Sequence, residues 1–159
     1  MSNRRFLVLA AAVAALTGCA TSSTPVSVTD TIAGQSQLST LNGLVTKAGL
    51  SDTLKAGGPY TVFAPTNEAF AKVPAKTMDE LGKDPAKLKA VLAYHVIPGK
   101  VMAADVKNGN AKTVNGANVA LSKAGEFVTV EEALVQTADI SATNGVVHIV
   151  DAVLIPPAK

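Results

Sequence analysis

The sequence predicts an α+β domain in which the helices come first and short strands follow. Apolar residues recur at three- and four-residue spacing between positions 38 and 48, which indicates one apolar helix face. After position 95, short β-branched runs alternate with glycine- and asparagine-containing turns. Helices and strands therefore do not alternate, as they would in a parallel α/β fold. Roughly 125 residues are enough for one core without disulfides.

The first half of the chain is predicted to carry the helices. Residues 30–50 form one amphipathic helix that ends at Gly49. Thr66 is a good N-cap for the helix that follows it, and Pro85 suits a first helical position. The other elements predicted here are a short helix opened by residues 51–54, a strand over 60–64, and helical segments over 67–72, 77–82 and 85–94.

The second half is predicted to supply most of the sheet. Asn115-Gly116 favours a two-residue hairpin turn, and Asn108–Asn110 and Asn144-Gly145 also read as turns. Glu131 and Glu132 are adjacent in a strand-like region, so they should point to opposite faces. The strand-like runs are 96–97, Val101, 113–114, 118–121, 127–130, 133–136 and 146–154.

The amino-terminal segment has the pattern of an export signal. Arg4 and Arg5 precede an apolar run over 6–16, which is too short for a permanent membrane span. The tetrad Leu16-Thr17-Gly18-Cys19 then resembles a bacterial lipobox. The resemblance implies cleavage before Cys19, a diacylglycerol on its thiol and an acylated new amino terminus. The alternatives are a plain signal peptide or a buried helix with an incidental cysteine.

This pattern divides the chain into three parts. Residues 1–18 are the predicted signal peptide, 19–29 the lipidated cysteine and a polar tether, and 30–157 the folded domain. Ala20 after the cysteine favours an outer membrane by the usual sorting pattern, so we expect an exported protein anchored to the cell envelope. Both arginines lie in the signal, which leaves lysines and acids in equal number. No basic field for nucleic acid remains.

Three segments carry a resemblance to a known family. They read TVFAPTNEAF at 61–70, LAYHVIPGKV at 92–101 and ATNGVVHIVDAVLIPP at 142–157. In this order and spacing they resemble the fasciclin domain, over nearly the whole predicted mature chain. The resemblance implies a compact wedge or sandwich of short strands with several helices packed on one side. It also implies a non-enzymatic role in adhesion or protein–protein contact, with an unidentified protein or cell-surface partner.

The resemblance also suggests individual residues. The positions that match the adhesion motifs of animal fasciclin domains are Tyr94, His95, Asp139 and Ile140. The match is partial, because Ala138 stands in place of a proline and Ser141 in place of a methionine. The residues expected to build the motifs themselves are Thr66, Asn67, Phe70, Asn144, Gly145 and His148.

The sequence offers no catalytic constellation. There is no Gly-x-Ser-x-Gly elbow, and Cys19 is the single cysteine. His95 and His148 each lie in an apolar run, so we expect both to be partly buried and hydrogen-bonded. Spacing does not support a metal site with Asp139 or Asp151, so no metal, cofactor or enzymatic activity is predicted. The alternative function is a binder of small apolar ligands or an envelope stress protein, because an aliphatic core can leave a pocket.

Overall fold

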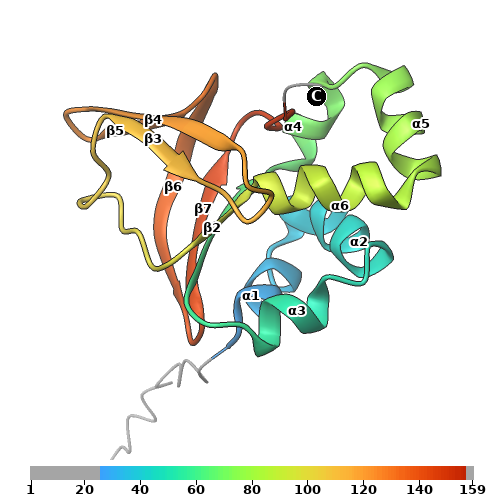
Figure 1. Cartoon of the computed structure of the whole chain (residues 1–159), viewed down its shortest axis with the longest axis horizontal. Coiled ribbons are helices and arrows are strands. Elements are labelled where there is room, and N and C mark those ends of the chain that lie inside the picture. Colours follow the sequence, from blue (N-terminus) through green and yellow to red (C-terminus); the bar gives the residue numbers. More distant parts are fainter. Residues whose placement is uncertain (1–25, 157–159) are drawn as a thin grey trace, which may run out of the picture.

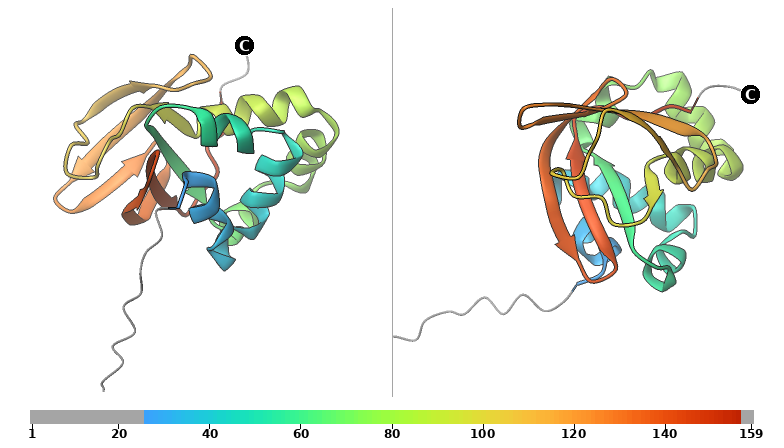
Figure 2. Two further views of the ribbon diagram at one scale, coloured as in Figure 1. Left: turned by 90° about the horizontal axis from the view of Figure 1, so that it is seen from below. Right: turned by 60° about the vertical axis from the view of Figure 1, so that its left-hand side comes forward.

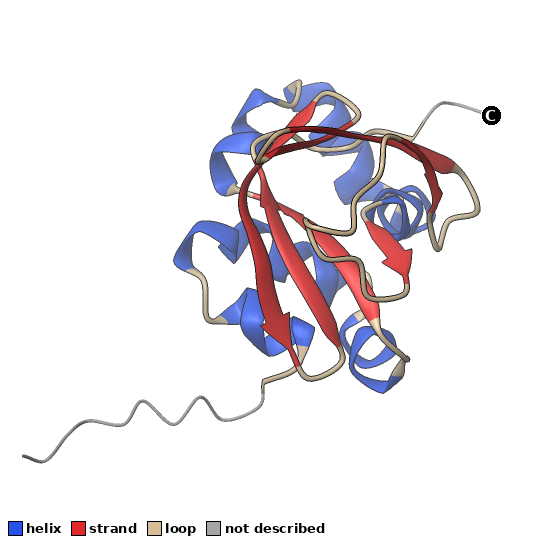
Figure 3. Cartoon of the chain, turned by 90° about the vertical axis from the view of Figure 1, so that its left-hand side faces the viewer, coloured by secondary structure: helices blue, strands red, loops and turns tan. Residues whose placement is uncertain are grey.

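The structure is a computed structural model that describes residues 26–156 (Figure 1). Cys19, the predicted signal peptide and most of the predicted tether lie outside the described residues. The described part is α+β, as predicted, with the helices gathered on one side of a curved sheet (Figures 1 and 3). The helices are α1 (Val28–Ala33), the 3₁₀ helix η1 (Ser36–Leu38), α2 (Ser39–Lys47), α3 (Ser51–Ala56), α4 (Asn67–Lys72), α5 (Ala75–Lys83) and α6 (Pro85–Tyr94).

The single helix predicted over 30–50 is wrong, because the chain forms α1, η1 and α2 there. Ile32 and Leu38 are both fully buried. Six residues apart, they would lie on different sides of a continuous helix, which turns about 100° per residue. Breaking the helix after Gly34 lets both side chains reach the core. In addition, α1 begins at Val28, so the folded part starts inside the range predicted for the tether.

Seven strands form one sheet in the order β2-β1-β7-β6-β5-β4-β3. The pair β1–β7 is parallel and the other pairs are antiparallel. The sheet curves strongly, so that the β3–β5 end comes round towards β2 (Figure 2). The strands are β1 (Tyr60–Pro65), β2 (Val96–Pro98), β3 (Gly109–Lys112), β4 (Asn118–Ala124), β5 (Phe127–Val130), β6 (Ala133–Ala142) and β7 (Gly145–Val150).

Several strand predictions need correction. The strand β3 begins inside the predicted turn 108–110, while Val101 and residues 113–114 belong to no strand. Val114 N–H instead donates to Val96 O at 2.8 Å and connects the end of β3 to β2.

The turns also differ from the predictions. The loop between β3 and β4 comprises residues 113–117 and is therefore longer than the predicted two-residue turn. Within this loop, Thr113 N–H donates to Ala117 O. Glu131 and Glu132 form the β5–β6 turn rather than a strand. At the end of the sheet, β7 stops at Val150, four residues before the predicted end at Leu154.

The strands β1 and β7 are buried on both faces, which separates two apolar clusters. The helix-side cluster contains Val62, Ala64, Val147 and Ile149 together with residues of the helices. The sheet-side cluster lies inside the curve of the sheet and contains Phe63 and Val150 together with residues of β4, β5 and the carboxyl end of α6. Strands of a parallel pair are usually covered on both faces, which explains their nearly continuous apolar sequences.

Two asparagines join distant segments at the ends of this central pair. Asn67 follows β1, accepts from Thr40 N at 3.0 Å and donates to Ser36 O at 3.1 Å, so it connects α4 to η1 and α2. Asn144 precedes β7, accepts from Val28 N at 2.8 Å and donates to Leu54 O.

The other motif residues complete the two corners. The Thr66 hydroxyl accepts from Ala69 N and caps α4, and Phe70 is buried in the helix-side cluster. A Cβ on Gly145 would lie 1.9 Å from Tyr60 O, so the β1–β7 pairing requires glycine at this position.

Replacing Asn67 by alanine is expected to lower the free energy of unfolding by about 1–2 kcal/mol, since it removes the side-chain bonds to Thr40 N and Ser36 O that join α4 to η1 and α2. Chemical denaturation measures the change. Asn110→Ala, on the exposed edge strand β3, is the matched control and should stay within about 0.5 kcal/mol of wild type. Equal stability of the two variants would contradict the role of Asn67.

Val147→Asp is expected to be more damaging and to prevent stable folding, because it places a carboxylate between β7 and the helices. Circular dichroism and thermal unfolding report the result. Leu134→Asp adds the same charge at an exposed position of β6 and should fold normally. A cooperative unfolding transition near the wild-type temperature for Val147→Asp would show that the core is misassigned.

Candidate functional site

Tyr94 ends α6 and connects it to the strands. Its ring is only 1% exposed and belongs to the sheet-side cluster. The hydroxyl lies 3.0 Å from Asn118 O and 2.8 Å from Glu131 Oε1, and it is the donor in both contacts. Burial, followed by the bond to the Glu131 carboxylate, raises the pKa of Tyr94 to about 12. Tyr94 therefore stays protonated and holds the helix end against β4 and the β5–β6 turn.

His95 follows Tyr94 and is held at two points. It is 2% exposed. Its Nδ1–H donates to Val91 O at 2.8 Å, and its Nε2 accepts from Leu154 N at 3.0 Å. These bonds fit the neutral ring with the proton on Nδ1. Burial lowers the pKa of His95 to about 4. The His95 side chain thus bonds a backbone carbonyl near the end of α6 and holds Leu154, which lies in the segment after β7.

His148 lies on β7 and faces the inside of the curved sheet. Its ring is stacked on Phe63 with centroids 5.6 Å apart. The Nε2–H donates to Val101 O at 2.8 Å, and Nδ1 accepts from Asp139 N at 3.1 Å. Burial lowers the pKa of His148, although the Val101 bond and the Asp139 charge oppose this effect.

Asp139 and Ile140 lie at an irregular point of β6. The register between β6 and β7 shifts between Thr137 and Ile140, and Asp139 has a φ of 59°. Its Oδ1 accepts from Ala103 N at 2.7 Å. Asp139 is therefore half-buried and hydrogen-bonded, so part of this predicted contact residue is covered by the protein itself. Ile140 is also partly buried, against the helix-side cluster.

These contacts converge on the connection between β2 and β3. We call residues 99–108 the crossing segment, because it passes over the inner side of the sheet from β2 to β3. His148 and Asp139 hold it from β7 and β6. Thr61 holds it from β1, because its hydroxyl donates to Gly99 O at 2.7 Å and accepts from Val101 N at 2.8 Å. The sequence reasoning missed this segment, although the isolated polar Thr61 in an apolar strand was a signal.

The structure therefore divides the predicted contact residues into two groups. Tyr94 and His95 are buried and anchor the carboxyl end of α6, so neither side chain reaches the surface. Asp139 and Ile140 lie beside the crossing segment, which exposes Lys100, Ala104, Asp105, Lys107 and Asn108. The crossing segment and Asp139 form the candidate interaction site.

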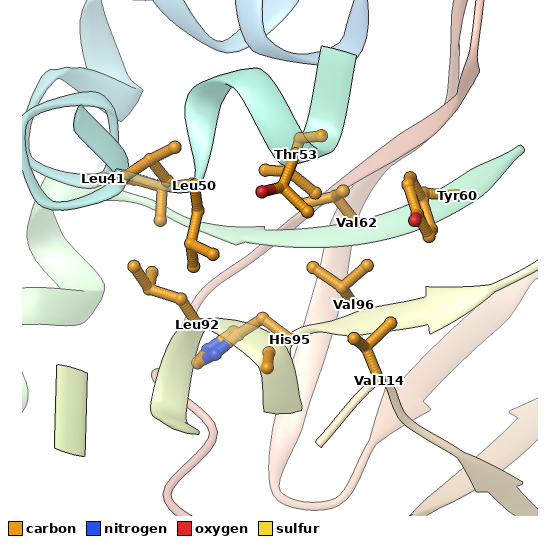
Figure 4. A pocket seen from close by; sticks show the side chains of 12 residues that line it. Leu41, Leu50, Thr53, Tyr60, Val62, Leu92, His95, Val96 and Val114 are labelled. Carbon is orange, nitrogen blue, oxygen red and sulfur yellow. The ribbon is translucent and has the colours of Figure 1, made fainter. Parts of the chain in front are cut away.

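An apolar cavity of about 50 Å³ lies between the helices and the edge of the sheet (Figure 4). Leu41 of α2, Val62 of β1, Leu92 of α6 and Val96 of β2 converge on it. An engineered cavity that binds benzene has about 150 Å³, three times this volume. The cavity therefore gives no support to the alternative of an apolar-ligand binder.

A wider groove of about 480 Å³ runs between α5, α6 and Ile155. Its lining includes Glu80 and Lys87, which have opposite charges.

Within residues 26–156, His, Asp and Glu side chains form no group of three or more that could hold a metal ion. In the same range, no helix combines the length and the apolar character that a membrane span needs.

Acid is expected to destabilise the protein through His95. The pKa is about 4 in the folded protein and about 6.5 in an unfolded chain, so between these values the unfolded chain binds a proton that the folded protein does not. This contribution to stability is complete above pH 6.5 and decreases as the pH falls towards 4. At pH 5 the loss is about 2 kcal/mol.

Urea unfolding of the wild type and of His95→Gln at pH 7 and pH 5 measures this contribution. His95→Gln is expected to be less stable than the wild type at both pH values. Its free energy of unfolding should change less between pH 7 and pH 5, because glutamine does not titrate. His148 contributes to the pH dependence of both proteins. An identical pH dependence in the two proteins would contradict the assignment to His95.

The fasciclin domain model matches residues 36–156. Protein sll1483 of Synechocystis sp. is 42% identical over 134 residues, which are 82% of this chain and 73% of that protein. The cell surface glycolipoprotein MPB83 of Mycobacterium bovis is 41% identical over 110 residues, 69% of this chain and 49% of that protein. This chain thus spans about half of the mycobacterial relative.

A solved structure agrees with these sequence relationships. A FAS1 domain pair from the insect cell adhesion molecule fasciclin I superposes with a TM-score of 0.62 at 25% identity, over 76% of this chain and 46% of that one. Proteins of this family are adhesion or secreted proteins and not enzymes. The motif segments, the strand order and the matched range lead to one conclusion: this chain belongs to the fasciclin domain family.

Proposed function

We propose that this protein is a lipid-anchored module of the cell envelope that mediates adhesion or protein contact without catalysis. The observation that carries the proposal is membership of the fasciclin domain family, because a solved member comes from an insect cell adhesion molecule. Within residues 26–156, every buried side-chain nitrogen and oxygen atom has a hydrogen-bond partner.

The proposed anchor is a diacylglycerol on Cys19. The tetrad Leu16-Thr17-Gly18-Cys19 supports it, and so does the cell-surface glycolipoprotein among the relatives. An extended chain from Cys19 to Val26 reaches at most about 25 Å. The domain would therefore sit close to the membrane, with α1 and the β6–β7 turn nearest to the lipid and the β4–β5 hairpin at the other end (Figure 1). An outer membrane is the proposed location.

The proposed contact surface is the crossing segment together with Asp139. It is accessible, it carries charges of both signs, and it is supported from three strands, so it offers a fixed shape to a partner. Tyr94 and His95 contribute indirectly by fixing the end of α6, from which the chain continues through β2 into this segment. The near balance of lysines and acids disfavours a nucleic-acid partner.

Cys19→Ser is expected to abolish lipid attachment, because serine cannot form the thioether. The wild-type protein should partition into detergent and its processing should be sensitive to globomycin, whereas the variant should lose both properties. Mass spectrometry of the mature amino terminus is the direct measurement. A wild-type protein that begins at another residue, without lipid, would overturn the anchor and leave the contact function untouched.

A charge reversal in the crossing segment is expected to weaken partner contact without loss of stability. Lys107→Glu changes an exposed residue of the segment, and Lys76→Glu makes the same change on the exposed side of α5. Crosslinking in intact cells, together with cell aggregation, should be reduced for Lys107→Glu and not for Lys76→Glu. Equal crosslinking and equal aggregation for the two variants would contradict the assignment of the crossing segment as the contact surface. Cell aggregation that is unchanged by deletion of the whole gene would contradict the proposed function.

A further inference from the structure

We propose that copies of this protein contact one another head to tail, with Phe127 on the β4–β5 hairpin of one copy seated in the groove between α5 and α6 of the next. The hairpin and the groove are parts of the fold that the proposed contact surface does not use. The contact therefore stands independently of the crossing segment, and only its location on a membrane rests on the proposed function.

Phe127 is an exposed aromatic side chain on a rigid support. It is 67% exposed, more than any other large apolar side chain within residues 26–156. It pairs with Ala124 across a two-residue turn, and Gly125 has the positive φ, 65°, that favours such a turn. The short hairpin holds its shape before binding, so little conformational freedom is lost when the ring is buried. Aromatic side chains presented in this way are typical anchors of protein interfaces.

The groove between α5 and α6 has the size and the lining to receive an aromatic ring. Its volume of about 480 Å³ is about three times that of the engineered cavity that binds benzene. Ile155 lines it and is 53% exposed, so apolar surface extends to solvent. The apolar residues of the lining are Leu81, Ala90, Val91, Ala117, Ile155 and Pro156.

The charges beside the two features are complementary. Glu126 precedes Phe127 at the tip of the hairpin, and Lys87 of α6 lines the groove. Both residues are exposed, and neither takes part in an ion pair within residues 26–156. Glu126 of one copy can therefore pair with Lys87 of the next. Glu80 of α5 also lines the groove and repels Glu126, so only an orientation with Glu126 towards Lys87 is favourable.

The positions of the two features in the fold make the contact heterologous. The β4–β5 hairpin and α5 lie at opposite ends of the long axis of the molecule (Figure 1), so the hairpin does not reach the groove of its own chain. An apolar projection and a complementary pocket at different places on one molecule join copies head to tail and leave the assembly open. Each copy inside such a row uses one hairpin and one groove.

The contact is small, so we expect it to depend on local concentration. One ring, one ion pair and their surroundings bury less than the roughly 800 Å² per partner of a standard interface. Lipid anchors hold copies on one membrane and thereby raise their effective concentration. The hairpin and α5 both lie away from α1, the first helix after the anchor segment (Figure 1). Anchored neighbours can thus form the contact, whereas the protein stays monomeric in dilute solution.

Disulfide trapping on intact cells tests the contact. The full chain carries Glu126→Cys together with Lys87→Cys and keeps Phe127, and copper phenanthroline is the oxidant. Because the two positions lie on separate parts of one copy, disulfides between them join different copies. We expect a ladder of dimers, trimers and larger species. Each single-cysteine variant should give no ladder, and the wild type shows any product that Cys19 forms by itself.

Phe127→Ser in the double-cysteine protein is the matched variant. Loss of the aromatic anchor should lower the yield of trimers and larger species about tenfold or more. Leu134→Ser removes another exposed apolar side chain, on β6, and should leave the ladder unchanged. Thermal unfolding should be the same for both variants, since both residues are exposed. Equal ladders from the two variants would overturn the inference.

The products also distinguish other arrangements. Dimers from Glu126→Cys alone, without a ladder from the pair, would show a contact between identical surfaces and overturn the head-to-tail arrangement. Disulfides to other proteins would show a different occupant of the groove, and the absence of any product would exclude the contact, so both results overturn the inference. A ladder in an organism whose cell aggregation is unchanged by deletion of the gene would support the contact and contradict the proposed function alone.

Discussion

The parallel pairing of β1 with β7 is the constraint on which the rest of the structure depends. The two strands are about eighty residues apart in sequence, and their register places Tyr60 beside Gly145 and Phe63 beside His148. The pair is buried on both faces, so helices must cover one side and the curved remainder of the sheet the other. Gly145 is part of this constraint, because its missing side chain leaves room for Tyr60 O.

Polar side chains then attach the peripheral segments to this pair. Asn67 and Asn144 connect its two ends to the helices, and His148 and Thr61 connect its inner side to the crossing segment. His95 connects the end of α6 to Leu154, in the segment after β7. Each of these residues bonds backbone groups in loops or near the ends of helices. An unpaired backbone group in the interior is costly, so such contacts fix loops that have little apolar surface of their own. The family motifs therefore consist largely of residues that position neighbouring segments.

This arrangement explains how buried polar contacts give the domain a surface of defined shape. The central pair and its polar contacts are buried, whereas the crossing segment and the β4–β5 hairpin carry exposed residues. The same contacts that define the shape of the crossing segment include a titratable ring. Burial lowers the pKa of both His148 and His95, so both rings link the stability of the fold to pH.

The sequence by itself determined the class of the fold and the family. Local patterns were sufficient for α4, α6, β1 and β5, because the cap at Thr66, Pro85 and the β-branched runs act over a few residues. The apolar runs around His95 and His148 also predicted hydrogen-bonded and partly buried side chains; both are hydrogen-bonded and only 2% exposed.

Only the tertiary structure decided the rest. The break between α1 and α2 follows from the need to bury both Ile32 and Leu38, and β3 forms in a run of polar residues because β4 offers it a partner. The position of Asp139 depends on a register shift against β7 and on a contact with Ala103, which is thirty-six residues away. Contacts between residues this far apart leave no periodic pattern in a single sequence, so the path of the crossing segment could not be predicted from it.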